Sequence, residues 1–316
     1  MSRRGWAMFA TMAVIWGIPY LLIKVAVSGV PVPVLVLSRV AIGAALLLPV
    51  AIRRRQLAQL LPHWRWLGIF ALVEIIIPWL LLSEAETRLS SSLSGLLIAS
   101  VPILVAVLAL ATGGTDRLSP VRWTGLLIGL AGVSLLVGPG VSGGDALSVG
   151  EVLLVALCYA TGPLVASRKL ADLPPVAMTA VCLGFASVVY APLAAMTWPA
   201  SLPSGKVLAA IAGLAVICTA VAFLIFFALI AEAGPARASV ITYINPAIAV
   251  AGGVWLLGER LTTAMVAAFV LILGGSVLAT RSGRRAAKEI SAPPGTAEAG
   301  PVPHNPEGLA SPASQG

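Results

Sequence analysis

Apolar segments of roughly 20 residues recur along the whole chain, and short polar stretches separate them. A helix of about 20 apolar residues is long enough to cross the hydrocarbon core of a bilayer. Backbone groups in that core must be paired within each segment, and the alternating pattern of a barrel strand is missing. The pattern therefore predicts an all-α, polytopic membrane protein with ten transmembrane helices. We expect them at about 6–27, 34–52, 66–83, 91–110, 121–137, 149–167, 176–196, 207–230, 236–257 and 263–280.

Composition supports this class, since 59% of the residues are hydrophobic and only 10% are charged. A net charge of +8 would suggest nucleic acid as a partner of a soluble chain, but most basic residues here lie in short clusters between apolar segments. We interpret them as topology signals and expect no nucleic-acid partner. Cys158, Cys182 and Cys218 are isolated in apolar segments, and His63 and His304 lie outside them. No disulfide, metal site, cofactor or histidine-based catalysis is therefore expected.

The distribution of basic residues also predicts the orientation of the chain. With a cytoplasmic N-terminus, 15 of the 20 Lys and Arg residues fall in cytoplasmic segments. This positive-inside bias predicts ten crossings, with both termini cytoplasmic. We expect a multi-pass protein of a cell membrane of the bacterial inner or plasma type.

Weak internal similarity predicts a duplication. Pro102 and Pro246 lie 144 positions apart, and the pairs Arg117-Leu118 and Arg260-Leu261 lie 143 apart. A period near 143 divides the chain into large repeats. Five helices in each repeat is an odd number, so the second copy would cross the membrane in the opposite direction. Inverted repeats are typical of secondary transporters, whose substrate site lies between the halves near the membrane midplane.

Three parts of the chain follow from this period. We expect a first five-helix repeat at 1–138 and a second at 139–285. Residues 286–316 are rich in Pro, Gly, Ala and Ser and have little apolar bulk, so this segment is predicted to be a disordered cytoplasmic tail.

Several short motifs, taken in order, resemble those of the EamA-type members of the drug/metabolite transporter superfamily. They are Ile15-Trp16-Gly17 with Lys24, Ser38-Arg39-Val40 with Ala44, Asn245-Pro246, Gly258-Glu259-Arg260-Leu261-Thr262, and Gly274-Gly275. The resemblance covers residues 6–280 and implies two five-helix repeats and export of amino acids, metabolites or drugs. It departs from the family at Val40, where an aromatic residue is common, and in the first-repeat turn, which has Thr115-Asp116.

Glu74 lies deep in the third predicted helix, within an otherwise apolar run. An ionised carboxylate facing lipid there would cost about 2.5–3.5 kcal/mol, so we expect it to face the interior of the bundle. It could neutralise a cationic part of the substrate or carry a proton. The alternative is a fixed ion pair with Lys24 or Arg39 that only joins helices.

Trp16, Tyr20 and Lys24 are spaced at i, i+4 and i+8 in the first predicted helix. Such a stripe can line a substrate cavity with ring faces and a charge. The alternative is that Lys24 extends to the headgroups and the aromatic rings are simply buried. Pro19 would bend this helix, which is useful for gating but also common in inert helices.

Arg39 lies early in the second predicted helix, near the outer surface in this topology. It is a candidate gating charge that pairs with Glu84 or Glu86 in the next outer loop. Contact with lipid headgroups is the alternative.

Two prolines mark candidate breaks in the predicted fourth and ninth helices. Pro246 cannot bond to the Thr242 carbonyl, and Tyr243 and Asn245 precede it, so polar groups are available within the membrane. Pro102 holds the related position in the first repeat. Broken helices at matching positions point to a transporter's binding site, so we assign Tyr243 and Asn245 to substrate binding and both prolines to gating. The alternative is that the kinks only let helices cross.

Two further features are expected to be structural. Glycines in the fifth and tenth predicted helices favour close approach of helix backbones. They are Gly125, Gly129, Gly132, Gly274 and Gly275. The Glu259-Arg260 turn lies at the outer rim in this topology and is expected to cap a turn or form a local pair.

The sequence thus predicts a secondary transporter that exports small organic solutes by alternating access, not an enzyme. It lacks the glycine-rich nucleotide-binding loop, so protons are the candidate coupling ion. An uncoupled, facilitative metabolite permease is the alternative. A membrane scaffold or intramembrane enzyme is less favoured, because the spans lack a catalytic cluster and a scaffold does not need inverted repeats. The expected partners are a small-molecule substrate and the bilayer, and homodimerisation is left open.

Overall fold

The computed structural model describes residues 1–111, 120–137, 145–234, 238 and 240–280. They belong to one compact unit, Met1–Arg281. Within these ranges all regular secondary structure is helical and no strand is present. The Thr115-Asp116 turn and the expected tail at 286–316 lie outside the described residues.

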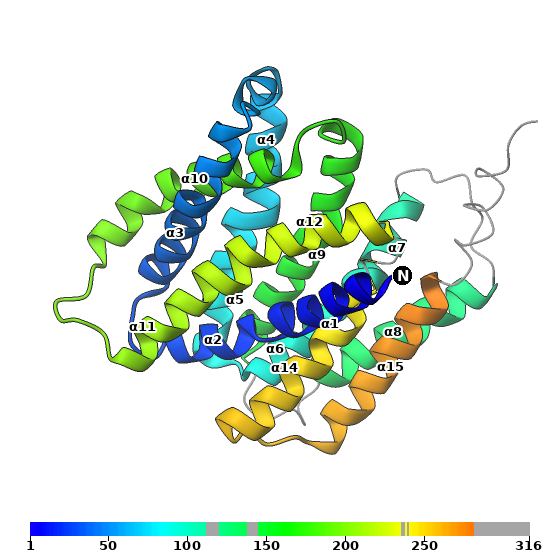
Figure 1. The fold of residues 1–316 in the computed structure, drawn as a ribbon. Helices are drawn as coiled ribbons and strands as arrows, with labels where there is room; N and C mark the ends of the chain where they lie inside the picture. The colour runs from blue at the N-terminus through cyan, green and yellow to red at the C-terminus, as the bar shows by residue number, and fades with distance from the viewer. Residues whose placement is uncertain (112–119, 138–144, 235–237, 239, 281–316) are drawn as a thin grey trace, which may run out of the picture. The chain divides into compact units, whose positions relative to one another are not determined.

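The helices of the N-terminal part follow one another with short connections (Figure 1). They are α1 (Arg3–Gly17), α2 (Pro19–Ala26), α3 (Val32–Arg53), the 3₁₀-helix η1 (Leu57–His63), α4 (Trp64–Ala71), the π-helix η2 (Leu72–Ile76), α5 (Ile77–Arg88), α6 (Ser91–Ile98), α7 (Val101–Ala111) and α8 (Pro120–Val137).

The C-terminal part continues in the same way. Its helices are α9 (Ala146–Lys169), α10 (Pro175–Met196), α11 (Gly205–Ala212), the π-helix η3 (Gly213–Val221), α12 (Ala222–Ala233), α14 (Ile241–Leu257) and α15 (Thr263–Thr280).

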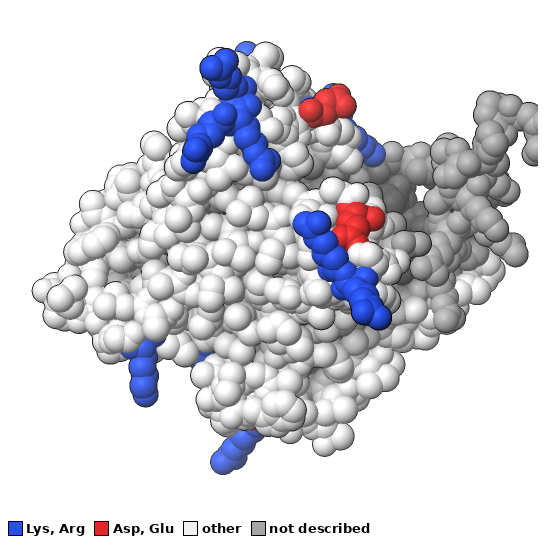
Figure 2. All heavy atoms as spheres, in the orientation of Figure 1, with Lys and Arg blue, Asp and Glu red and all other residues white. Residues whose placement is uncertain are grey.

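Seven helical stretches of the described chain are long and apolar enough to cross a membrane. They are Arg3–Ala26, Val32–Arg53, Leu57–Arg88, Ser91–Leu108, Ala146–Lys169, Pro175–Met196 and Gly205–Ala233. Three shorter apolar helices are Trp123–Leu136, Ile241–Leu257 and Thr263–Ala279. On the face drawn in Figure 2, charged side chains project from a few places and the broad surface between them is uncharged. These features agree with a multi-pass membrane protein.

Helix ends are satisfied by local side chains where the chain leaves a span. Ser2 accepts from the backbone N–H of Gly5 at the start of α1, and Ser90 accepts from Leu93 N–H at the start of α6. Gly258 ends α14 with φ +66°, a conformation that suits a residue without a β-carbon. Because lipid supplies no hydrogen bonds, such caps stabilise each end.

Helix boundaries recur at the offset found in the sequence. The α1–α2 pair runs from Arg3 to Ala26 and α9 runs from Ala146 to Lys169, so both bounds differ by 143 positions. The same offset relates the bounds of α3 to those of α10 and the bounds of α8 to those of α15. It also places η2 within η3, so the two π-helices occupy corresponding positions. π-Helices are rare and are frequent at functional sites.

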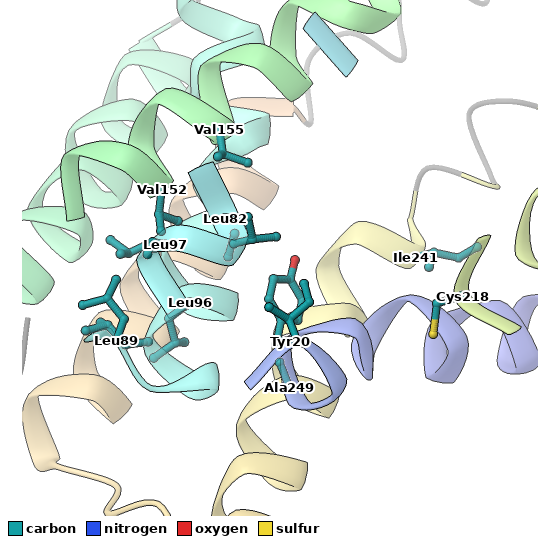
Figure 3. Packing of buried hydrophobic residues seen from close by; sticks show 14 of the residues in the cluster. Tyr20, Leu82, Leu89, Leu96, Leu97, Val152, Val155, Cys218, Ile241 and Ala249 are labelled. Carbon is teal, nitrogen blue, oxygen red and sulfur yellow. The ribbon is translucent and has the colours of Figure 1, made fainter. Parts of the chain in front are cut away.

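The most extensive helix contacts join α8 to α15 and α3 to α10, and Figure 1 shows each pair side by side. Buried apolar residues form two clusters, one centred on α1, α2, α6 and α9 and the other on α3, α4, η2 and α10. Figure 3 shows Tyr20 of α2 among residues of the first cluster, including Leu82, Leu97 and Val155.

The contact between α8 and α15 depends on glycine. A β-carbon at Gly275 would lie 2.6 Å from the carbonyl oxygen of Gly125 and 2.6 Å from Cα of Gly129. These are backbone atoms, so relief would require the helices to separate. The neighbouring Gly274 is exposed, and a β-carbon there would meet no atom within 4 Å.

We predict that Gly275→Ala lowers the midpoint of thermal unfolding by on the order of 5 °C, because overpacking costs about 1–3 kcal/mol. Gly274→Ala is the matched control. It should leave the midpoint unchanged or slightly raised, since alanine is the better helix former. Thermal unfolding of both purified variants in detergent tests this, and equal effects of the two substitutions would contradict it.

Candidate functional site

Arg39 lies within α3 and is buried, with 8% of its surface exposed. Its Nε donates a hydrogen bond of 3.0 Å to Oγ1 of Thr219 in η3. Its Cζ lies 3.6 Å from the ring centroid of Trp79 in α5. Thr219 in turn donates to the Leu214 carbonyl at 2.8 Å. Three helical segments that are distant in sequence therefore hold one guanidinium group in a fixed plane.

Arg39 lies in the first half of α3, as expected, but its side chain is enclosed by the bundle. Its burial excludes contact with lipid headgroups in this conformation. No ion pair joins it to Glu84 or Glu86 in the described part of the chain. The physical reason is that α3 packs against α5, α10 and η3, so this side of the helix faces the bundle.

Other polar side chains surround Arg39. The guanidinium interacts electrostatically with Tyr159 of α9, Tyr20 of α2 and Glu86 of α5. We call Tyr20, Arg39, Glu86 and Tyr159 the buried polar cluster. Tyr20 and Glu86 are buried, with 7% and 0% of their surfaces exposed, and Tyr159 is partly buried. The cluster combines a cation, a carboxyl group and two phenols within an apolar bundle.

Glu86 differs most from its predicted place. It was expected in an outer loop, but it lies in the last turn of α5 and is fully buried. Neither carboxyl oxygen has a hydrogen-bond partner among the described residues. Buried polar groups without partners are uncommon and costly, so this carboxyl group is a candidate for binding a proton or a ligand.

Lys24 holds the end of α5. Its Nζ donates to the carbonyl oxygens of Glu86 and Leu89, both at 2.7 Å. Carbonyls at a helix C-terminus lack partners within the helix, and a cation there also interacts favourably with the helix dipole. Lys24 therefore stabilises a helix end in this conformation, in addition to any role in substrate binding.

Glu74 lies in the π-helix η2 and is partly buried. Its Oε2 is buried without a hydrogen-bond partner, and the carboxylate packs against Gly162 of α9. The alternative of a fixed ion pair with Lys24 or Arg39 is not formed among the described residues. The carboxyl group thus contacts a neighbouring helix, as expected for a residue that faces the bundle.

The aromatic stripe of the first predicted helix is divided. α1 ends at Gly17 and α2 begins at Pro19, so Trp16 and Tyr20 lie on different helices. Trp16 packs against α12, with ring centroids 4.5 Å from Phe226 and 6.1 Å from Phe223. Tyr20 instead joins the buried polar cluster. The predicted break at Pro19 is confirmed, but it separates the residues that were assigned to one stripe.

Pro102 and Pro246 occupy different places in their helices. Pro102 is the second residue of α7, directly after the interruption that separates α6 from α7, whereas Pro246 lies inside the continuous helix α14. The Asn245 carboxamide, oriented so that its nitrogen faces acceptors, donates to the carbonyls of Ala13 at 3.2 Å and Ile241 at 3.1 Å. Asn245 therefore joins α14 to α1. Tyr243 is partly buried in the first turn of α14.

Glu259 caps a helix far away in the sequence. Its carboxylate accepts from the backbone N–H groups of Ser91 and Ser92 at 2.8 and 2.9 Å and from their hydroxyls at 2.9 and 2.5 Å. Partial burial alone would raise the pKa of Glu259, but these bonds to Ser92 and Ser91 outweigh it and hold the pKa below the ordinary value of 4.5. The expected cap is present, but it stabilises the N-terminus of α6 rather than its own turn.

A surface hollow of the described chain does not coincide with this chemistry. It has a volume of about 360 Å³ and lies between α7, α8 and α9. Its lining is apolar except for Ser100, and it includes none of the buried polar cluster. A hollow with so few polar groups lacks the directional contacts of a specific site. The buried polar cluster is therefore the better candidate.

Comparison with known proteins identifies the family. The EamA-like transporter family matches residues 3–138 and 148–281. The chain belongs to the EamA-like transporter family. Relatives include the uncharacterized inner membrane transporter YedA of Escherichia coli, 27% identical over 87% of this chain and 89% of that protein. The uncharacterized transporter YvbV of Bacillus subtilis is 24% identical over 84% and 88%.

A solved crystal structure shares the EamA-type fold of this chain. The match has a TM-score of 0.64 with 22% identity and covers 90% of this chain and 99% of the other. At this identity the likeness concerns the fold alone.

Three residues of the site were not predicted from the sequence: Trp79, Tyr159 and Thr219. A signal existed for Tyr159, because it lies 143 positions after Trp16 and so occupies the corresponding place in the repeat. No local pattern points to Thr219, which is 180 positions away from Arg39.

We predict that the Glu259 cap makes stability depend on acid pH. Its pKa is lowered on folding, so its contribution is present above the unfolded-state pKa and is lost as pH falls through the folded-state pKa. Glu259→Gln should lower the unfolding temperature at pH 7 by a few degrees and reduce the wild-type decrease below about pH 4.5.

Thermal unfolding of purified protein across a pH series measures both effects. Glu84→Gln is the control, since the Glu84 carboxylate forms an exposed pair of 3.7 Å with Arg88. An unchanged pH profile in Glu259→Gln would show that the cap is not what links stability to pH.

Proposed function

We propose that the protein is a secondary transporter that exports a small organic solute by alternating access between two inverted five-helix halves. The observation that carries this proposal is the composition of the buried polar cluster. Its side chains come from α2, α3 and α5 on one side and α9 on the other, and Thr219 of η3 fixes Arg39. A polar site shared between halves can open alternately to each side when the halves move.

The recurrence of helix boundaries at an offset of 143 supports two related halves. The contacts support a two-fold relation as well: α1 packs against α12 and α14, and its counterpart α9 packs against α5, α6 and α7. Exchanging the two halves converts one set of contacts into the other. With the three shorter apolar helices counted as spans, each half has five, and the second then runs opposite to the first.

Helix interruptions give the halves places to bend. The chain breaks at Pro19 and before Pro102, and the π-helices η2 and η3 occupy corresponding positions. We assign gating to these breaks, to Pro246 and to Arg39. Helices can change direction at such points without exposing many backbone groups.

Within this mechanism, Glu74 is the candidate proton carrier, and Trp16, Tyr20 and Tyr243 line the path. Lys24 and Asn245 take part through the helix ends and helix contacts that they hold. The second candidate function is an uncoupled permease, because a buried carboxyl group does not by itself establish proton coupling. We also propose that both termini lie in the cytoplasm of a bacterial-type cell.

Transport assays with purified protein in vesicles test the function. Vesicles loaded with one solute are diluted into a labelled panel of amino acids, organic anions and organic cations, with and without an imposed pH gradient. Saturable exchange that needs the protein supports a transporter, and dependence on the gradient separates coupled export from facilitated diffusion. Absence of exchange for the whole panel would contradict the proposal.

We predict that Glu74→Gln loses most of the accumulation driven by a pH gradient while still inserting into membranes, because a carboxamide does not carry a proton. Glu84→Gln is a matched control with an exposed carboxylate. Normal gradient-driven transport by reconstituted Glu74→Gln across a pH series would remove Glu74 from the mechanism.

The proposed topology gives a separate prediction. A reporter that is active only in the cytoplasm should be active when it is fused after Arg285, since ten crossings return the chain to the side on which it began. A reporter that is active only outside the cytoplasm should be silent at the same site. The reverse result would overturn the ten-helix count.

A further inference from the structure

Arg39 is a buried cation that no carboxylate of the described residues contacts at ion-pairing distance. Among the described residues it forms no ion pair, and its only hydrogen bond runs from Nε to Thr219. An arginine side chain remains charged in proteins. Burial of an unpaired charge costs several kcal/mol, so buried charges are normally paired. No carboxylate among the described residues lies within ion-pairing distance of the guanidinium, so Arg39 can accept a bound anion as its partner.

The guanidinium group is oriented as an anion receptor. The Trp79 ring covers one face at 3.6 Å, and the Nε bond to Thr219 fixes the rotation of the group. The two terminal nitrogens make no hydrogen bond to any described residue. Together they present a planar fork that matches the two oxygens of a carboxylate. Lysine could supply the charge but not this geometry.

Glu86 is the protein carboxyl group that competes for this fork. It interacts electrostatically with Lys24, Glu259 and Arg39, but no cation of the described chain lies within ion-pairing distance and neither oxygen accepts a hydrogen bond. The terminal nitrogens of Arg39 thus remain available to an incoming group. If Glu86 were bound to the terminal nitrogens of Arg39, its carboxyl oxygens would accept hydrogen bonds from them. Neither oxygen accepts one.

An aromatic surface that continues along the chain from Thr219, the partner of Arg39, indicates what the rest of the ligand is like. Phe223 lies one helical turn after Thr219, and it packs against Trp16 with ring centroids 6.1 Å apart. Phe226 and Phe227 extend the same aromatic surface, and all three phenylalanines are partly exposed. Aromatic side chains form favourable contacts with flat apolar ligands.

We infer that Arg39 binds the anionic group of the transported solute, and that this solute is an organic anion with a carboxylate on an apolar, ring-bearing body. The carboxylate accepts two hydrogen bonds from the terminal nitrogens of Arg39, and the ring packs against the aromatic surface of Trp16 and Phe223. This inference rests on the proposed transport function, because it names the substrate class of the same site.

Binding to the full-length protein in detergent tests the inference without a transport assay. The probes are benzoate, phenylacetate and indole-3-acetate, each compared with its primary amide, which has nearly the same shape but no charge. At least one carboxylate should raise the unfolding temperature in a saturable manner, and its amide should not. If an amide stabilises the protein as well as its carboxylate does, or if none of the carboxylates does, the inference is overturned.

Variants of Arg39 test whether the stabilising carboxylate binds at this residue. Arg39→Gln should abolish the carboxylate-dependent shift, and Arg39→Lys should weaken the apparent affinity by about tenfold or more, because it keeps the charge but loses the fork. Arg54→Gln, at the exposed end of the same helix, is the matched control and should retain the shift. A retained shift in Arg39→Gln would overturn the inference. Should Arg39→Gln fail to fold, Arg39→Lys and the comparison with amides still decide it.

The outcomes for binding and transport are separable. Carboxylate binding through Arg39 without any exchange in vesicles would contradict the proposed transport function and leave the anion site standing. Exchange of neutral or cationic solutes that is unaffected in Arg39→Lys would support transport and overturn the anion site.

Discussion

The absence of water in the hydrocarbon core constrains every part of this structure, because each backbone group there needs a partner within the protein. Continuous helices meet this condition by themselves. The interruptions do not, and side chains from other helices complete them. Lys24 of α2 binds two carbonyls at the end of α5, and Glu259 binds the first N–H groups of α6. These helix ends are therefore places where distant segments are held together.

The same condition explains how a polar site can exist inside an apolar bundle. The π-helix η3 is tied to α3 through the bond between Thr219 and Arg39, and the Tyr190 hydroxyl of α10 donates to the Ile76 carbonyl at the end of η2. Each π-helix is thus contacted by a polar side chain from the α3–α10 pair. These bonds fix the frame around Arg39 and leave its terminal nitrogens unbonded to the described protein. An arginine that is held in place with its terminal nitrogens unbonded is suited to bind a negatively charged ligand.

The pattern of apolar segments alone predicted much of the helical architecture. The ten expected segments each overlap a helical stretch of the described chain, and the break at Pro19 occurs where the ring removes a backbone donor. The residues of the candidate site could be predicted from the sequence only in part. Tyr20 was predicted and lies in the buried polar cluster, whereas Glu86 was placed in a loop because the third helix was expected to end at residue 83. In the structure α5 continues through them, and only Glu86 points into the bundle.

The sequence by itself determined the membrane class, the helices and the period of 143 residues, because these depend on hydrophobicity, local hydrogen bonding and spacing along one chain. The tertiary structure alone decided which side chains meet. The contacts of Arg39 with Thr219 and of Glu259 with Ser91 join residues 180 and 168 positions apart. Apolar helices of similar composition can pack in many orientations, and hydropathy does not distinguish among them. Only the packed bundle shows that the Arg39 side chain is enclosed within it.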